Sequence, residues 1–119
     1  QDYTGEFLAQ QGDITDVSKK LQFVWAVKAD NPQMMTQAWT KAMKKINPKN
    51  SVHMISSSIL NPGFGGANLY GLSSAVDYKT INDELNIIWG SKEWTEFSKN
   101  NGGFEILINF SRQIVKSWN

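Results

Sequence analysis

The stretch LQFVWAVKADNPQMMTQAWTKAMKKI, residues 21–46, carries the clearest fold signal in the chain. Apolar side chains occupy both parities of residues 21–29, which predicts a strand with both faces covered. Asn31 then supplies an N-cap, and Pro32 occupies the first helical position that proline favours. Apolar residues recur at helical spacing as far as residue 46. The stretch therefore predicts one strand that leads directly into one helix.

The remaining sequence continues the same alternation of strands and helices. Further strands are predicted at 52–60 and 67–76, joined by a loop rich in glycine and proline. Asp77 is placed to cap a second helix, which Gly90-Ser91 interrupts before a short continuation. Alternating apolar residues from residue 104 to residue 110 predict a fourth strand.

The order strand-helix-strand-strand-helix-strand over residues 20–112 is the split βαβ pattern of ferredoxin-like domains. Because such crossovers are right-handed, we expect both helices on one face of a four-stranded antiparallel sheet. At 119 residues the chain is long enough to bury a core as a single domain. We interpret residues 1–19 as an N-terminal arm and residues 20–119 as this α+β domain with a C-terminal extension.

The uncovered face of the predicted sheet carries few charges whichever parity is chosen, with Lys28 and Glu105 near strand ends. A large uncharged surface of this kind is typical of an interface. The element order, the helix break at Gly90-Ser91 followed by Trp94 and Phe97, and the C-terminal extension resemble the dimeric α+β barrel superfamily. The resemblance implies a homodimer that packs sheet against sheet. A monomeric ferredoxin-like domain is the alternative.

Members of that superfamily include cofactor-free monooxygenases of aromatic polyketides, haem-degrading enzymes and lactone isomerases. The haem-degrading members typically take their axial histidine from the second helix region, whereas the only histidine here is His53. We therefore expect no cofactor. The resemblance implies a small apolar or aromatic ligand between sheet and helices, with cofactor-free monooxygenase activity as one expectation. The alternative function is a non-catalytic structural or interaction module.

Five residues are the candidates for lining such a ligand cavity, namely Trp25, His53, Tyr70, Trp89 and Asn109. The three large aromatic residues would supply flat apolar walls. His53 is the one imidazole in the chain, and Asn109 is a polar residue inside a predicted strand, where burial costs free energy unless it is paired. Core packing of the tryptophans and a surface or interface position for His53 are the alternatives.

Other catalytic chemistries have weak support in the sequence. The absence of cysteine excludes disulfides, thiolate zinc sites and thiol nucleophiles. Serines are frequent in the predicted strands, but no Gly-x-Ser-x-Gly elbow occurs and His53 has no evident acidic partner. Asp77, Asp83 and Glu84 are interpreted as a helix cap and a solvated first turn. The sequence thus predicts no hydrolase.

Charge and hydropathy bear on partners and location. Twelve Lys+Arg against eleven Asp+Glu leave a net charge of +1, which argues against a nucleic-acid partner. No apolar run approaches the length of a membrane span, so no membrane partner is expected. A start at Gln1 without a hydrophobic signal region fits either a mature exported protein or a trimmed cytoplasmic one.

Overall fold

The computed structural model describes residues 6–13, 21–57 and 66–113. Five strands and three helices lie in this part of the chain: β1 Glu6–Gln11, β2 Leu21–Ala29, α1 Pro32–Ile46, β3 Val52–Ser57, β4 Leu69–Ala75, α2 Tyr78–Trp89, α3 Lys92–Asn100 and β5 Phe104–Gln113. The predicted mixed α+β class is confirmed. Most of the glycine-rich loop and the proposed C-terminal extension lie outside the described residues.

The strands form one antiparallel sheet in the order β1-β3-β4-β2-β5. The expectation of four strands is wrong, because β1 lies in the stretch interpreted as an arm and pairs with β3, for example Gln11 opposite His53. An edge strand is held by main-chain hydrogen bonds on one side only, so it needs no strong apolar pattern. Its sequence EFLAQQ shows no such pattern.

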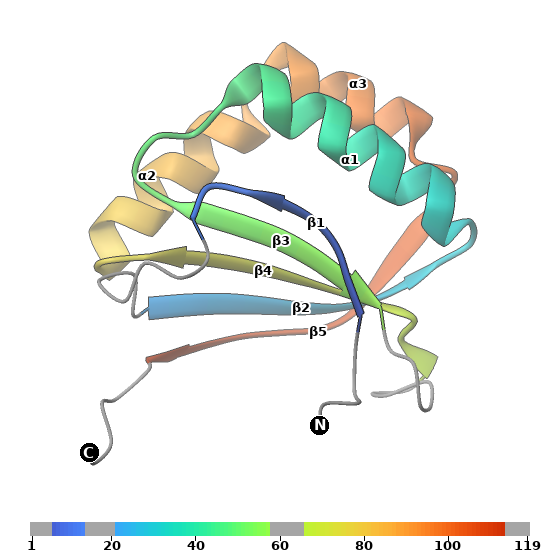
Figure 1. Cartoon of the computed structure of the whole chain (residues 1–119), viewed down its shortest axis with the longest axis horizontal. Coiled ribbons are helices and arrows are strands. Elements are labelled where there is room, and N and C mark those ends of the chain that lie inside the picture. Colours follow the sequence, from blue (N-terminus) through green and yellow to red (C-terminus); the bar gives the residue numbers. More distant parts are fainter. Residues whose placement is uncertain (1–5, 14–20, 58–65, 114–119) are drawn as a thin grey trace.

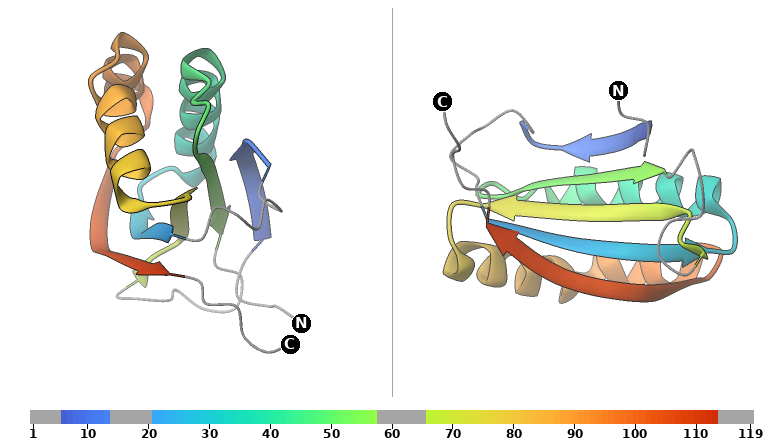
Figure 2. Two further views of the ribbon diagram at one scale, coloured as in Figure 1. Left: turned by 90° about the vertical axis from the view of Figure 1, so that its left-hand side faces the viewer. Right: turned by 90° about the horizontal axis from the view of Figure 1, so that it is seen from below.

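All three helices cover the same face of the sheet (Figure 1). Viewed along the layers, α1 stands on one side and α2 with α3 on the other (Figure 2). The expected caps are present: Asn31 Oδ1 accepts the Met34 N–H at 3.1 Å, and Ser91 Oγ accepts the Trp94 N–H at 3.1 Å. The break at Gly90-Ser91 therefore ends α2 and begins α3 as a separate helix.

The core fills the space between the helices and the sheet. From β2 it takes Val27 and Ala29, while α1 contributes Trp39 and Met43 and α2 contributes Ile88, all buried. These positions follow the strand alternation and the helical apolar stripe that the sequence predicts. Within the described residues, no helix is long and apolar enough to cross a membrane.

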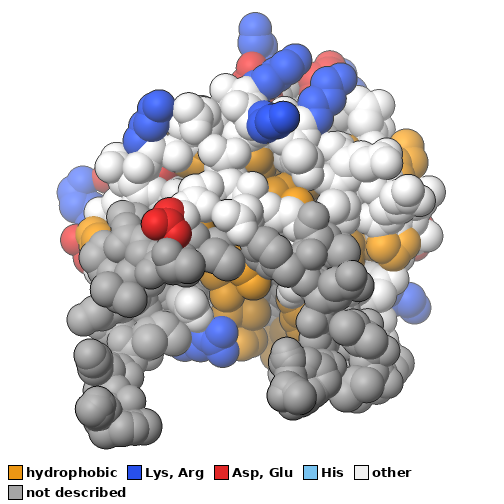
Figure 3. Space-filling view, in the orientation of Figure 1, with side chains coloured by type: hydrophobic (Ala, Val, Ile, Leu, Met, Phe, Trp, Pro, Cys, Tyr) orange, Lys and Arg blue, Asp and Glu red, His pale blue; other side chains and the backbone are white. Residues whose placement is uncertain are grey.

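The opposite face of the sheet, which we call the open face, carries two cross-strand rows. One row is Met54, Leu72, Val24 and Phe110, and the next is Ser56, Tyr70, Ala26 and Ile108. None of the eight is charged, and Lys28 and Arg112 lie toward the strand ends. Val24 and Ala26 at the centre are buried, whereas the other six are partly or fully exposed. In the view of Figure 3, Lys and Arg gather mainly over the helices, and apolar side chains show on the lower side.

Candidate functional site

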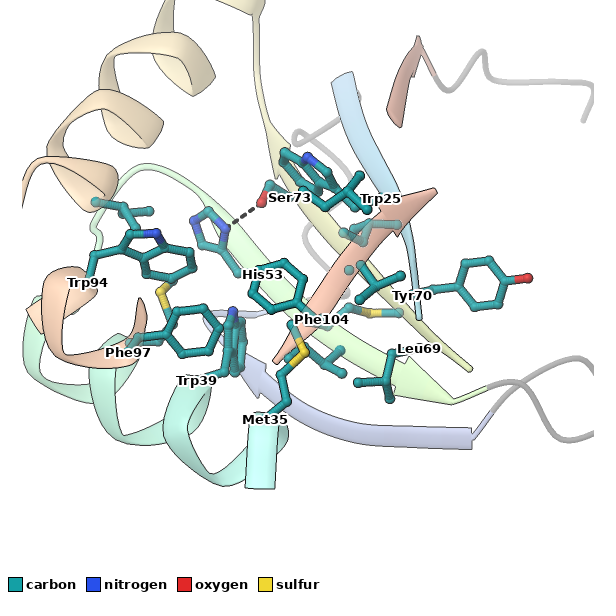
Figure 4. Close-up of a pocket in the computed structure, with 18 of the residues that line it drawn as sticks. Trp25, Met35, Trp39, His53, Leu69, Tyr70, Ser73, Trp94, Phe97 and Phe104 are labelled. Atoms are coloured by element: carbon teal, nitrogen blue, oxygen red, sulfur yellow. Dashed lines mark hydrogen bonds between the residues drawn. The ribbon is translucent and has the colours of Figure 1, made fainter. Parts of the chain in front are cut away.

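A cavity of about 270 Å³ lies between the sheet and the helices (Figure 4). Its walls are almost wholly apolar: Trp25 and Leu69 come from the sheet, Trp39 from α1, Leu85 from α2 and Phe97 from α3. An apolar cavity of about 150 Å³ is enough to hold benzene. The space here therefore fits a bicyclic aromatic molecule, and its volume is close to the ~300 Å³ at the lower end of ligand sites.

The mouth of the cavity lies between the end of α2 and the edge strand β5. Trp89 and Ile106 both line the cavity, yet they are 48% and 50% exposed. Phe104, also on β5, is exposed as well. The residues on α1 that line the cavity are buried, so the closed end is on that side.

Aromatic contacts hold the walls in place. Trp25 meets Trp89 edge to face with ring centroids 6.3 Å apart, and Trp94 lies 4.5 Å from Phe97. Such pairs contribute stabilisation beyond their buried area. Four tryptophans line the cavity, so tryptophan fluorescence can be used to follow binding there.

Gly71 forms part of the sheet surface beneath the cavity. It pairs with Trp25 on β2 and Ile55 on β3, which both face the helices, so a side chain at this position would point the same way. A Cβ placed there would meet only Trp25 atoms, at 3.9 Å. The missing side chain therefore leaves room in the cavity.

The polar part of the site is a buried sequence of hydrogen bonds, which we call the polar chain: Glu84, Ser51, His53 and Ser73. Glu84 Oε1 accepts a hydrogen bond from Ser51 Oγ, which in turn lies 2.7 Å from His53 Nε2. The other imidazole nitrogen, Nδ1, lies 2.7 Å from Ser73 Oγ. Only His53 and Ser73 of the four line the cavity.

His53 is 3% exposed, so the alternative of a surface position for this histidine is wrong. Burial disfavours the imidazolium and lowers the pKa of His53 from 6.5 to about 4. At neutral pH the ring is therefore neutral and carries one proton. No Lys, Arg, Asp or Glu is among the described residues that line the cavity.

The structure brings four of the five candidate residues to the cavity. Trp25, His53, Tyr70 and Trp89 line it, although the Tyr70 ring points away from His53 and belongs to the open face (Figure 4). Asn109 does not line it. Asn109 pairs with Trp25 across β2 and β5 but is exposed on the edge strand.

Sequence reasoning missed Ser51, Ser73 and Glu84. The interpretation of Glu84 as part of a solvated turn is wrong, because its exposed fraction is only 9%. A helical-stripe signal was available: Glu84 follows Ile81 by three residues and precedes Ile88 by four, so it shares their inward face. His53 therefore has an acidic partner, reached through Ser51.

The described residues contain no group of three or more His, Asp or Glu side chains that could hold a metal ion. Comparison of the chain with models of known protein families and with curated proteins finds no match.

Proposed function

We propose that this protein binds a small, flat, apolar ligand in the cavity between sheet and helices. The observation that carries the proposal is the 270 Å³ space itself, walled by aromatic side chains and open beside Trp89. A packed protein interior leaves few voids larger than a water molecule, because each costs dispersion contacts. A non-catalytic structural module would have no use for this space.

The enzymatic expectation concerns the same cavity. A cofactor-free monooxygenase of the kind the resemblance implies would hold its aromatic substrate between these walls and would take molecular oxygen as its second substrate. Binding is the part of the function that the cavity supports, and it is tested independently of turnover.

Indene is a suitable probe because it is a flat bicyclic hydrocarbon of the size the cavity accepts. We expect saturable binding with a Kd on the order of 100 μM, corresponding to about 0.6 kcal/mol per heavy atom. Isothermal calorimetry measures the Kd, and quenching of tryptophan fluorescence reports the location. An absence of saturable heat and quenching up to the solubility limit of indene would contradict the proposal.

We also propose that residues 21–113 are a ferredoxin-like unit with β1 added at its edge. Without β1 the strand order is β3-β4-β2-β5, α1 connects β2 to β3, and α2 with α3 connects β4 to β5. Each connection joins two strands that are separated by one other strand in the antiparallel sheet, as the split βαβ pattern requires.

The open face supports a homodimer as the second part of this proposal. Its two central rows hold no charged side chain. In the first row each of the four strands contributes one apolar residue larger than alanine. A second copy of the same face offers the matching surface, since a two-fold interface is self-complementary. Burial of about 800 Å² on each partner is the usual size of a stable contact.

Native mass spectrometry tests the dimer, with an expected mass of twice the 13.4 kDa chain. Ile108→Glu places a charge on the open face at a residue that does not line the cavity, and it is expected to give monomers, because an unpaired charge buried in an interface is costly. The matched control is Ile87→Glu, at an exposed apolar position on α2 far from that face. A wild-type monomer, or equal dissociation by both variants, would contradict a sheet-to-sheet dimer.

A further inference from the structure

The polar chain has a direction, and its starting point is Glu84. Oε1 of Glu84 accepts the Asn50 backbone N–H at 3.1 Å as well as the Ser51 hydroxyl. A backbone N–H can only donate, so this oxygen is an acceptor. The Ser51 hydroxyl, which has a single proton, therefore donates its hydrogen bond to Glu84.

The direction passes through the histidine. Because the Ser51 hydroxyl already donates to Glu84, its oxygen can only accept a hydrogen bond from the imidazole nitrogen 2.7 Å away. A neutral imidazole carries one proton, so the nitrogen facing Ser73 has none and accepts the Ser73 hydroxyl proton. The opposite orientation of the ring would turn carbon atoms toward both hydroxyls, so only the observed orientation makes the two hydrogen bonds.

Ser73 is where the chain reaches the cavity. The Ser73 hydroxyl donates its hydrogen bond to His53, and a hydroxyl oxygen can still accept a hydrogen bond while it donates one. We infer that Ser73 Oγ presents an acceptor to the cavity, so the ligand is an aromatic molecule that donates one hydrogen bond, such as a phenol or an indole. This inference rests on the proposed binding function and names the substrate class that the cavity selects.

The remaining lining side chains sharpen the expectation. Apart from His53, Ser73 and Tyr70, the described lining residues are apolar or tryptophan. A tryptophan N–H can only donate, so it would favour the opposite kind of ligand, one with an acceptor. A comparison of the affinities for a donor ligand and an acceptor ligand therefore distinguishes contact with Ser73 from contact with a tryptophan N–H.

Three probes of nearly equal shape separate these cases: indole has a ring N–H donor, benzofuran has a ring oxygen, and indene has neither. With the wild-type protein, calorimetry is expected to give about two- to twelvefold tighter binding of indole than of benzofuran, the range of one neutral hydrogen bond. Ser73→Ala is expected to remove this preference and to retain indene binding, which shows that the variant keeps its cavity.

Glu84→Leu is the second variant, because Glu84 does not line the cavity and acts on the ligand only through the polar chain. Without an acceptor at this position the Ser51 hydroxyl can donate to His53 or accept from it, so the direction of the remaining hydrogen bonds is no longer fixed. We expect the indole preference to fall toward unity while indene binding is retained.

The outcomes distinguish the two levels of the argument. If none of the three probes binds, the proposed binding function fails. If indene binds but indole is no better than benzofuran, or if Ser73→Ala keeps the preference, the inference about Ser73 is overturned while the cavity stands. Tighter binding of benzofuran than of indole would assign the polar contact to a tryptophan N–H instead.

Discussion

The free energy of unfolding is expected to fall by about 3 kcal/mol between pH 7 and pH 4 through His53 alone. The pKa of this residue is 6.5 in the unfolded reference and about 4 in the folded protein. As the pH falls below 6.5, His53 becomes protonated in the unfolded chain but stays neutral in the folded protein until the pH is near 4. Each unit of pKa difference corresponds to about 1.4 kcal/mol of stability. The stabilisation is thus complete above pH 6.5 and is lost as the pH approaches 4.

Urea unfolding at a series of pH values measures this effect, with His53→Gln as the control. Glutamine cannot titrate, so the carboxylates contribute almost equally to both proteins and cancel in the difference. The wild-type protein should lose about 3 kcal/mol relative to the variant over this range. Parallel curves for the two proteins would mean that His53 is accessible to protons in the folded state.

Much of the fold could be predicted because its signals are local. The N-cap at Asn31, the proline after it and the apolar stripe of α1 all lie within one short stretch. The cap at Asp77, whose side chain accepts the Thr80 N–H, is equally local. By contrast, β1 is defined by its pairing with β3 more than 40 residues further along the chain, and its own sequence carries little strand pattern.

The candidate site likewise has a part that could be predicted from the sequence and a part that depends on contacts between distant residues. The resemblance led us to expect Trp25 and Trp89 in the wall of one ligand cavity, and in the structure their rings are in contact. The polar chain could not be predicted, because Glu84 on α2 meets Ser51, 33 residues earlier, only through the packing of the helix on the sheet. Ser73 faces His53 only in the register of the β3–β4 pair.

Gly71 has the largest expected effect on binding. Gly71→Val adds a branched side chain that points into the cavity, so indene affinity should fall at least about tenfold by loss of space. The stability should change in the opposite direction, by about 1 kcal/mol in favour of the variant. Glycine inside a strand costs backbone entropy, whereas valine suits a strand. Calorimetry with indene and urea unfolding measure the two effects.

Gly71→Ala is the matched control for this prediction. Its Cβ meets Trp25 at an ordinary contact distance of 3.9 Å, so the variant should gain most of the backbone stabilisation while keeping indene affinity within about threefold. If Gly71→Val lost stability together with binding, the loss would reflect strain rather than a filled cavity. Unchanged affinity in Gly71→Val would place the ligand elsewhere. Opposite signs for stability and binding would mean that the glycine keeps open a space that folding alone would favour closing.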